Sequence, residues 1–365
     1  MLSLEELMQA CHWTNLRSNN LTRSIFLTAI LILICIFTNT GCTKEYSKGK
    51  NMSLLQEKPV FEIKISAFGV KYFVEVNGIS VLSELDPDGQ VSLTLPINHW
   101  MRSGENTIGI SAFPNKEKMP FNSRGYVKID LTVRELSKKG KTYTVATLHF
   151  SGKKDENQSH TGMSSPSGIY ASTMEFQLLE SGDINVVDPV DKPMIGYEGA
   201  ILFERKINIP SSLPLWKFFI SEKIPDYTTI ENENEYDRAM APLFKEYEKL
   251  QNALSNRKVE PILSMFEERN QEIDMAFYLE PGTTAADLRE SLLSAAGNKD
   301  LELLGLSIDN VNWHLEDNGK LVSLRRYGLD HAIILNYVNE KKAAVGSRAY
   351  PMYFRLQDGK WILTR

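Results

Sequence analysis

The period of the hydrophobic pattern changes along this chain, and this change constrains the fold more than any other feature. Between residues 59 and 228, apolar and polar residues alternate, which is typical of half-buried antiparallel strands. After the acidic run at 231–235, apolar residues recur at the spacing of amphipathic helices, and from residue 301 the alternation returns. The positions that show these patterns best are Phe61, Ile63, Ile65, Val127, Ile129, Leu131, Leu243, Tyr247, Leu250 and Leu254.

The alternating segment 59–228 predicts a β-sandwich domain, because many short strands, frequent turns and no helical stretch are typical of that architecture. Asn77-Gly78 and Asp88-Gly89 are hairpin signals, since both central residues of a type I′ turn need a positive φ. A further strand is expected at 215–221. The stretch LPINHWMRSGENTIGI, residues 95–110, resembles the hairpin region of jelly-roll modules found beside glycosidase catalytic domains, which implies a jelly-roll-like sandwich.

Residues 236–365 predict a second domain, in which helices come first and strands follow. One of the expected strands covers 348–356, and Asp358-Gly359 is a hairpin signal after it. The order of elements and the ending YPMYFRLQDGKWILTR resemble the nuclear transport factor 2-like (SnoaL-like) cone fold. This resemblance implies an α+β cone-fold domain whose helices lean on a curved sheet and enclose a pocket; a generic α+β domain is the alternative.

The N-terminal 41 residues predict a signal peptide. The apolar run Ile25–Phe37 is shorter than the ~20 residues of a membrane-spanning helix, but it has the length of a secretory core, and Arg17 and Arg23 precede it. Cys42 follows small residues at its end. This segment resembles the signal of bacterial lipoproteins, which implies cleavage after residue 41 and a lipidated Cys42 on a polar tether, 42–58. A cleaved signal without lipid and an uncleaved N-terminal anchor are the alternatives.

The resemblance to lipoprotein signals also implies a location and a partner. A lipidated Cys42 would attach the protein to the lipid bilayer of the bacterial cell envelope. Thr43, rather than Asp, follows the cysteine, so by resemblance to Gram-negative sorting the outer membrane, facing the periplasm, is favoured over the inner membrane.

Composition excludes several classes of function. The formal net charge of −5, with no basic stripe, argues against nucleic-acid binding. The chain has three cysteines, and none follows Cys42, so cysteine nucleophiles and cysteine-ligated metals are excluded from the exported part. Zinc-binding HExxH, Asp-rich calcium loops and Gly-rich phosphate loops are absent from the sequence, so no metal and no cofactor is expected.

The candidate site residues lie in the C-terminal domain. His331 could act as a general base oriented by Asp309 or Asp330, although an ordinary polar residue at a strand end is the alternative. Tyr337, Tyr353 and Trp313 are candidates for lining a ligand pocket, since aromatic side chains with a polar tip both pack and hydrogen-bond; core packing is the alternative. In the run 267–272, Arg269 could direct a guanidinium inward.

These observations favour a non-catalytic binding or interaction module, because no set of nucleophile, base and oxyanion donors can be assembled from the sequence. Its partner would be an unknown protein or a small-molecule ligand. Two alternatives stay open. One is an envelope enzyme, a hydrolase or isomerase that uses the pocket of the cone; the other is an inhibitor or immunity protein against an envelope-acting toxin.

Overall fold

The structure is a computed structural model that describes most of the chain after residue 57. The residues described are 58–85, 89–115, 120–136, 142–152, 169–171, 185–186, 190–193, 200–209, 213–316, 319–326, 331–339 and 343–365. The predicted signal peptide, Cys42 and all of the tether except Lys58 lie outside them. We refer below to the N-terminal part, 58–209, the connecting segment, 213–223, and the C-terminal part, 224–365.

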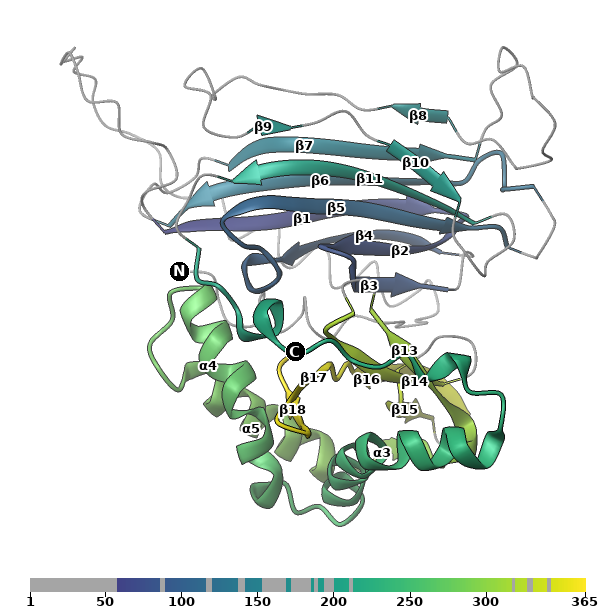
Figure 1. The fold of residues 1–365 in the computed structure, drawn as a ribbon, viewed down its shortest axis with the longest axis vertical. Helices are drawn as coiled ribbons and strands as arrows, with labels where there is room; N and C mark the ends of the chain where they lie inside the picture. The colour runs from purple at the N-terminus through teal and green to yellow at the C-terminus, as the bar shows by residue number, and fades with distance from the viewer. Residues whose placement is uncertain are drawn as a thin grey trace.

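Two antiparallel sheets form the N-terminal part (Figure 1). The first has the strand order β4-β1-β6-β7-β8, and the second has the order β10-β11-β5-β2-β3, with β9 also paired to β11. The strands are β1 Pro59–Phe68, β2 Lys71–Val76, β3 Ile79–Glu84, β4 Gln90–Pro96, β5 Gly104–Phe113, β6 Tyr126–Glu135, β7 Thr142–Ser151, β8 Ile169–Ala171, β9 Asn185–Val186, β10 Val190–Pro193 and β11 Ile201–Ile209.

Alternation explains how the two sheets share a core. Ile63 and Ile129, from the first sheet, belong to the same buried cluster as Val74 and Ile110, from the second. Their polar neighbours along each strand point to the other face, because successive side chains of a strand alternate. The turn predicted at Asn77-Gly78 is confirmed: φ is 55° and 68° at these two residues, which connect β2 to β3. This arrangement is consistent with the all-β N-terminal part that the alternation predicts.

The C-terminal part contains three α-helices and two sheets in the residues described. The helices are α3 Glu233–Ser255, α4 Glu267–Ala276 and α5 Thr283–Gly297. The strands are β12 Leu301–Leu303, β13 Val311–Leu315, β14 Val322–Arg326, β15 Ile333–Val338, β16 Ala344–Tyr350, β17 Phe354–Gln357 and β18 Lys360–Leu363. One sheet has the order β12-β15-β16 and the other the order β13-β14-β17-β18.

Helix α3 follows its sequence signals closely. The side chain of Asn232 accepts a hydrogen bond from the backbone N–H of Glu235 at 3.1 Å, which satisfies one of the free N–H groups at the helix start. Leu243, Tyr247 and Leu250 recur at helical spacing and are all buried. Within the described residues, no helix combines the length and the apolar character that crossing a membrane requires.

The prediction of an α+β cone-fold domain is wrong. A cone needs one continuous curved sheet, whereas these strands form two sheets that meet at an isolated bridge, Arg325 to His331. With four sheets and three α-helices, strand is the most common element of the described chain. Pro351 explains part of the error, because it lacks an N–H group and interrupts the strand expected at 348–356. The strand ends at Tyr350, and β17 begins only at Phe354.

The connecting segment also differs from expectation. The strand predicted at 215–221 is instead a 3₁₀ helix over Lys217–Ile220. Trp216 and Phe218 are almost fully buried in the same cluster as the N-terminal core, while Leu215 and Ile220 are exposed. This run therefore packs as a compact turn against the N-terminal part and does not extend a sheet.

Candidate ligand site at the junction of the two parts

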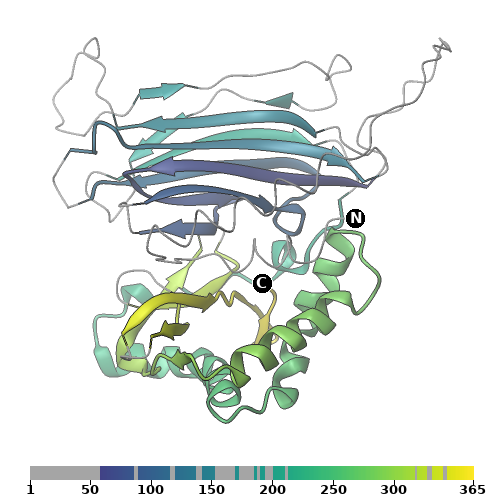
Figure 2. The same cartoon turned by 180° about the vertical axis from the view of Figure 1, so that it is seen from behind.

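The C-terminal part lies along one edge of the sandwich, next to β3 (Figures 1 and 2). The contact is apolar at its centre. Ile273 and Phe277, from and just after α4, and Tyr353, between β16 and β17, belong to the buried cluster of the N-terminal core. The two parts are therefore joined through shared hydrophobic burial, which contributes about 25 cal/mol per Å² of apolar surface removed from water.

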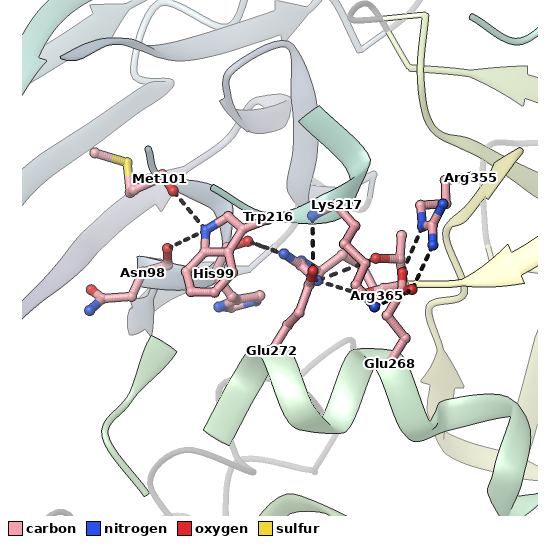
Figure 3. A network of polar contacts seen from close by, with 10 residues as sticks. Asn98, His99, Met101, Trp216, Lys217, Glu268, Glu272, Arg355 and Arg365 are labelled. Atoms are coloured by element: carbon pink, nitrogen blue, oxygen red, sulfur yellow. Dashed lines mark hydrogen bonds and ion pairs between the residues drawn. The ribbon is translucent and has the colours of Figure 1, made fainter. Parts of the chain in front are cut away.

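Asn98 fixes the position of α4 against β1. Its Oδ1 accepts the backbone N–H of Phe61 at 2.6 Å, and its Nδ2 donates to the carbonyls of Pro59 and Ala276 at 2.7 and 2.8 Å. The side chain is fully buried and uses its acceptor and both donor directions. In Figure 3, the indole N–H of Trp216 donates to the carbonyls of Asn98 and Met101, so the connecting segment is held at the same point.

A buried ion pair lies beside Asn98. Nη1 of Arg365 is 2.5 Å from Oε2 of Glu272, and Nε and Nη2 of Arg365 donate to the carbonyl of His99 at 3.0 and 2.7 Å (Figure 3). The other oxygen of Glu272 accepts the backbone N–H of Lys217 at 2.9 Å. Burial lowers the pKa of Arg365 to about 10, and Glu272 opposes this shift, so the guanidinium stays charged at neutral pH.

Two side chains of the C-terminal part satisfy the outer backbone groups of the edge strand β3. Ser80 donates its N–H to Oε2 of Glu316 at 3.0 Å, and its carbonyl accepts the hydroxyl of Tyr353 at 2.6 Å. Both side chains are buried. At Ser80 the free edge of the sheet is therefore covered by side chains and not by another strand.

A cavity of about 120 Å³ lies within this junction. Both parts contribute to its wall, among them Leu82, His99 and Trp100 from the N-terminal part and Arg269, Arg325 and His331 from the C-terminal part. Most of the wall is apolar, and no Asp or Glu belongs to it among the residues described. A mostly apolar hollow with a few convergent polar groups is the usual form of a small-molecule site.

Arg325 organises the polar side of the cavity. Its Nη1 lies 3.1 Å from Nδ1 of His331, its Nη2 donates to the hydroxyl of Tyr353 at 2.9 Å, and its Nε donates to Ser323. A guanidinium can only donate, so Nδ1 of His331 is the acceptor and the proton of the neutral ring is on Nε2. Glu316 lies 3.8 Å from Nη2 of Arg325 and balances its charge.

Three histidines at this junction are held neutral. Burial, and then Arg325 and His314, lower the pKa of His331 well below its usual range, and burial and Arg325 lower the pKa of His314 to about 3. Burial, followed by Arg365 and Arg269, lowers the pKa of His99. At neutral pH the positive charge at the cavity therefore comes from arginines.

These lowered pKa values predict that acid destabilises the protein. The unfolded chain binds protons at its histidines below about pH 6.5, whereas the folded chain does not, so the free energy of unfolding should fall as pH drops below 6.5. Each such histidine contributes a slope of up to about 1.4 kcal/mol per pH unit. His331→Gln, which keeps an acceptor for Arg325, should flatten this dependence in urea unfolding followed by circular dichroism. His149→Gln should flatten it less, because Asp130 opposes the shift at His149.

The structure brings together two of the residues predicted from sequence and separates the others. His331 and Tyr353 both line the cavity, and both bind Arg325. Asp309 does not orient His331; it is exposed and accepts a hydrogen bond from Ser307 in a 3₁₀ turn. Tyr337 pairs within its sheet and is not part of the cavity wall. Trp313 is buried in the C-terminal core between the rings of Tyr227 and Trp361.

Sequence reasoning missed His99, Arg325 and Arg365, which come from three distant segments. His99 follows an N-terminal strand, Arg325 ends β14 and Arg365 follows β18. The one available signal was the pair of adjacent charges Arg325-Arg326 in a short strand with Val322 and Leu324, which is unusual unless one of them is paired inside. Arg269, for which the sequence allowed an inward-pointing guanidinium, lines the cavity.

No group of three or more His, Cys, Asp or Glu side chains suited to a metal ion occurs in the described part of the chain. The comparisons with known proteins add no assignment: no protein-family model, no curated protein and no solved structure matches this chain. Any functional conclusion therefore depends on the geometry of the junction and on the sequence signals at the N-terminus.

Proposed function

We propose that this protein is a lipid-anchored lipoprotein of the bacterial envelope whose exported part binds a ligand in the junction cavity without catalysing a reaction. The apolar run Ile25–Phe37 and Cys42 support the anchor, although both lie outside the described residues. The cavity supports ligand binding, since it is walled by both parts of the chain and combines apolar surface with fixed hydrogen-bond donors.

The observation that carries the preference for binding is the state of His331. Its Nδ1 lone pair, the one a general base would use, already accepts a hydrogen bond from Arg325. Its Nε2 carries the proton in that tautomer, and the neighbouring cation makes the ring a weak base. The residue is thus suited to donating a hydrogen bond to a ligand and poorly suited to removing a proton from one.

Filling the cavity tests this proposal. Ala349 lines the cavity from β16, whereas Val345 on the same strand is 43% exposed, so Ala349→Leu and Val345→Leu form a matched pair. We expect compounds from a library of small organic molecules to bind the full chain and Val345→Leu, but not a folded Ala349→Leu, in ligand-observed NMR. Hits that bind all three proteins equally, or turnover of generic ester, glycoside or phosphate substrates that His331→Ala abolishes, would contradict the proposal.

The anchor is tested at Cys42. Cys42→Ser should abolish incorporation of labelled palmitate and leave an unprocessed or misplaced protein, because the thiol is the acylated group in the proposed modification. Cys35→Ser, in the apolar run, is the matched control and should label like the wild type. Equal labelling of the wild type and Cys42→Ser would refute the proposed anchor.

A further inference from the structure

The charge of the cavity wall points to the kind of ligand it takes. Arg269 from α4, Arg325 from β14 and Arg365 each contribute to the wall. Glu272 pairs with Arg365, and Glu316 lies 3.8 Å from Arg325; neither carboxylate is part of the wall. A molecule in the cavity therefore meets guanidinium groups without meeting a carboxylate, and this arrangement favours an anion over a cation.

Arg325 is held in place for binding. Three of its N–H groups donate to Ser323, His331 and Tyr353, which fixes the plane of the guanidinium, and the side chain is 4% exposed. A guanidinium has five N–H donors in a planar fork that matches the geometry of a carboxylate. Because neighbouring side chains already hold the group in one position, little conformational entropy is lost when a ligand binds.

His99 provides an independent observation. The side chain lines the cavity and is 7% exposed, and its Nδ1 is buried without a hydrogen-bond partner among the described residues. Leaving a buried polar atom unpaired is costly, so such an atom in a cavity wall calls for a partner that the described residues do not supply. With the proton on Nδ1, neutral His99 would donate to an anionic oxygen.

The rest of the wall limits the body of the ligand. Leu82, Ile97 and Ile273 present aliphatic surface, and Trp100 presents part of its ring. The volume of about 120 Å³ is slightly below the ~150 Å³ of an engineered cavity that holds benzene in another protein. The body should therefore be short and apolar, of four to six carbon atoms by roughly this measure.

We propose that the junction cavity binds a small organic acid, with its carboxylate toward the guanidinium groups of Arg269 and Arg325 and the side chain of His99, and its short aliphatic body against Leu82, Ile97 and Ile273. This inference rests on the proposed function, in which the same cavity is the ligand site. It adds the charge and the size class of the ligand.

Three probes of nearly equal shape test the charge directly. Isovalerate, isovaleramide and isoamylamine carry a negative, a neutral and a positive head on the same branched body. We expect isovalerate to bind the full chain about 10-fold or more tightly than isovaleramide, because charge-assisted hydrogen bonds are about twice as strong as neutral ones. Isoamylamine should not bind. Binding is measured by isothermal titration and by the fluorescence of the cavity-lining Trp100, with Trp100→Phe as the signal control.

Variants of two arginines test where the carboxylate of the ligand binds. Arg269→Gln should weaken isovalerate binding about 10-fold and leave isovaleramide binding unchanged, since only the charged partner is lost. Arg289→Gln is the matched control: it removes a half-exposed arginine from α5 and should change neither affinity by more than about 2-fold. Arg325→Gln should also weaken binding, and circular dichroism will show whether that variant is folded.

The outcomes separate this inference from the proposed function. Equal or tighter binding of the amide or the amine, or tighter binding of inorganic phosphate than of isovalerate, would refute the assignment of the ligand as an organic acid. The proposal of a ligand-binding cavity would still stand. Isovalerate binding that Arg269→Gln and Ala349→Leu do not alter would place the acid elsewhere and also overturn the inference. If neither these probes nor the library compounds bind, both the inference and the proposed function are refuted.

Discussion

Glu272→Gln should lower the free energy of unfolding by about 3–5 kcal/mol, because it leaves the guanidinium of Arg365 buried without its ion-pair partner. Arg365 is 4% exposed and cannot turn to water without giving up the carbonyl of His99. The variant also weakens the hydrogen bond that Glu272 accepts from the backbone of Lys217. Urea unfolding of the full chain, followed by circular dichroism, measures the effect.

The matched control is an ion pair at the surface. Glu105 and Lys206 lie 3.1 Å apart, and both side chains are about half exposed. Because water solvates each charge when the other is removed, Glu105→Gln should cost about 0–1 kcal/mol. A similar loss in the two variants would mean that burial does not decide the strength of the pair at Glu272, contrary to our interpretation of the junction.

Asn98→Asp should destabilise the protein by about 3 kcal/mol or more at neutral pH. The shape of the side chain is kept, but an aspartate cannot donate to the carbonyls of Pro59 and Ala276, which would then face a buried negative charge. The loss should be smaller in acid. A carboxyl group in this position would have a raised pKa in the folded state, so protonation on lowering the pH restores stability relative to the wild type.

Asn208→Asp is the matched control for this substitution, because Asn208 is exposed on β11. It should change the free energy of unfolding by less than about 0.5 kcal/mol at any pH between 5 and 8. Thermal unfolding at pH 5 and pH 8 distinguishes the two sites. If Asn98→Asp is as stable as Asn208→Asp, the amide of Asn98 does not hold α4 to β1.

Local features of the fold could be predicted because they depend on residues close in sequence. Asn77-Gly78 forms its hairpin, and Asp358-Gly359 connects β17 to β18 with φ of 50° and 71°. The helical spacing of Leu243, Tyr247 and Leu250 marks the buried face of α3. In each case a short-range rule of backbone geometry or side-chain periodicity is sufficient.

The arrangement of strands could not be predicted in the same way. The alternation around Pro351 indicates one strand, yet the structure breaks it there and turns Tyr353 toward the N-terminal part. Whether a proline ends a strand or sits at its edge depends on the neighbouring chain. The structure consequently has two smaller sheets where a single curved sheet was predicted.

The candidate site was only partly predictable for a related reason. His331 and Tyr353 were expected in a pocket enclosed by one domain, whereas they line a cavity between two parts of the chain. Its other polar groups, among them His99 and Arg325, lie far apart in the sequence. No spacing pattern within one segment predicts that these residues lie close together, because their proximity depends on how the two parts pack.

The hydrogen bonds of Glu316 and Tyr353 with Ser80 of β3 have a consequence for self-association of the protein. An exposed edge strand is a template on which a strand of another molecule can add. At Ser80 that position is taken by side chains of the same chain, so a strand of another molecule cannot pair there while the two parts stay together. Proteolytic loss of the C-terminal part would expose the backbone groups of Ser80 at this edge. We therefore expect the remaining sandwich to aggregate.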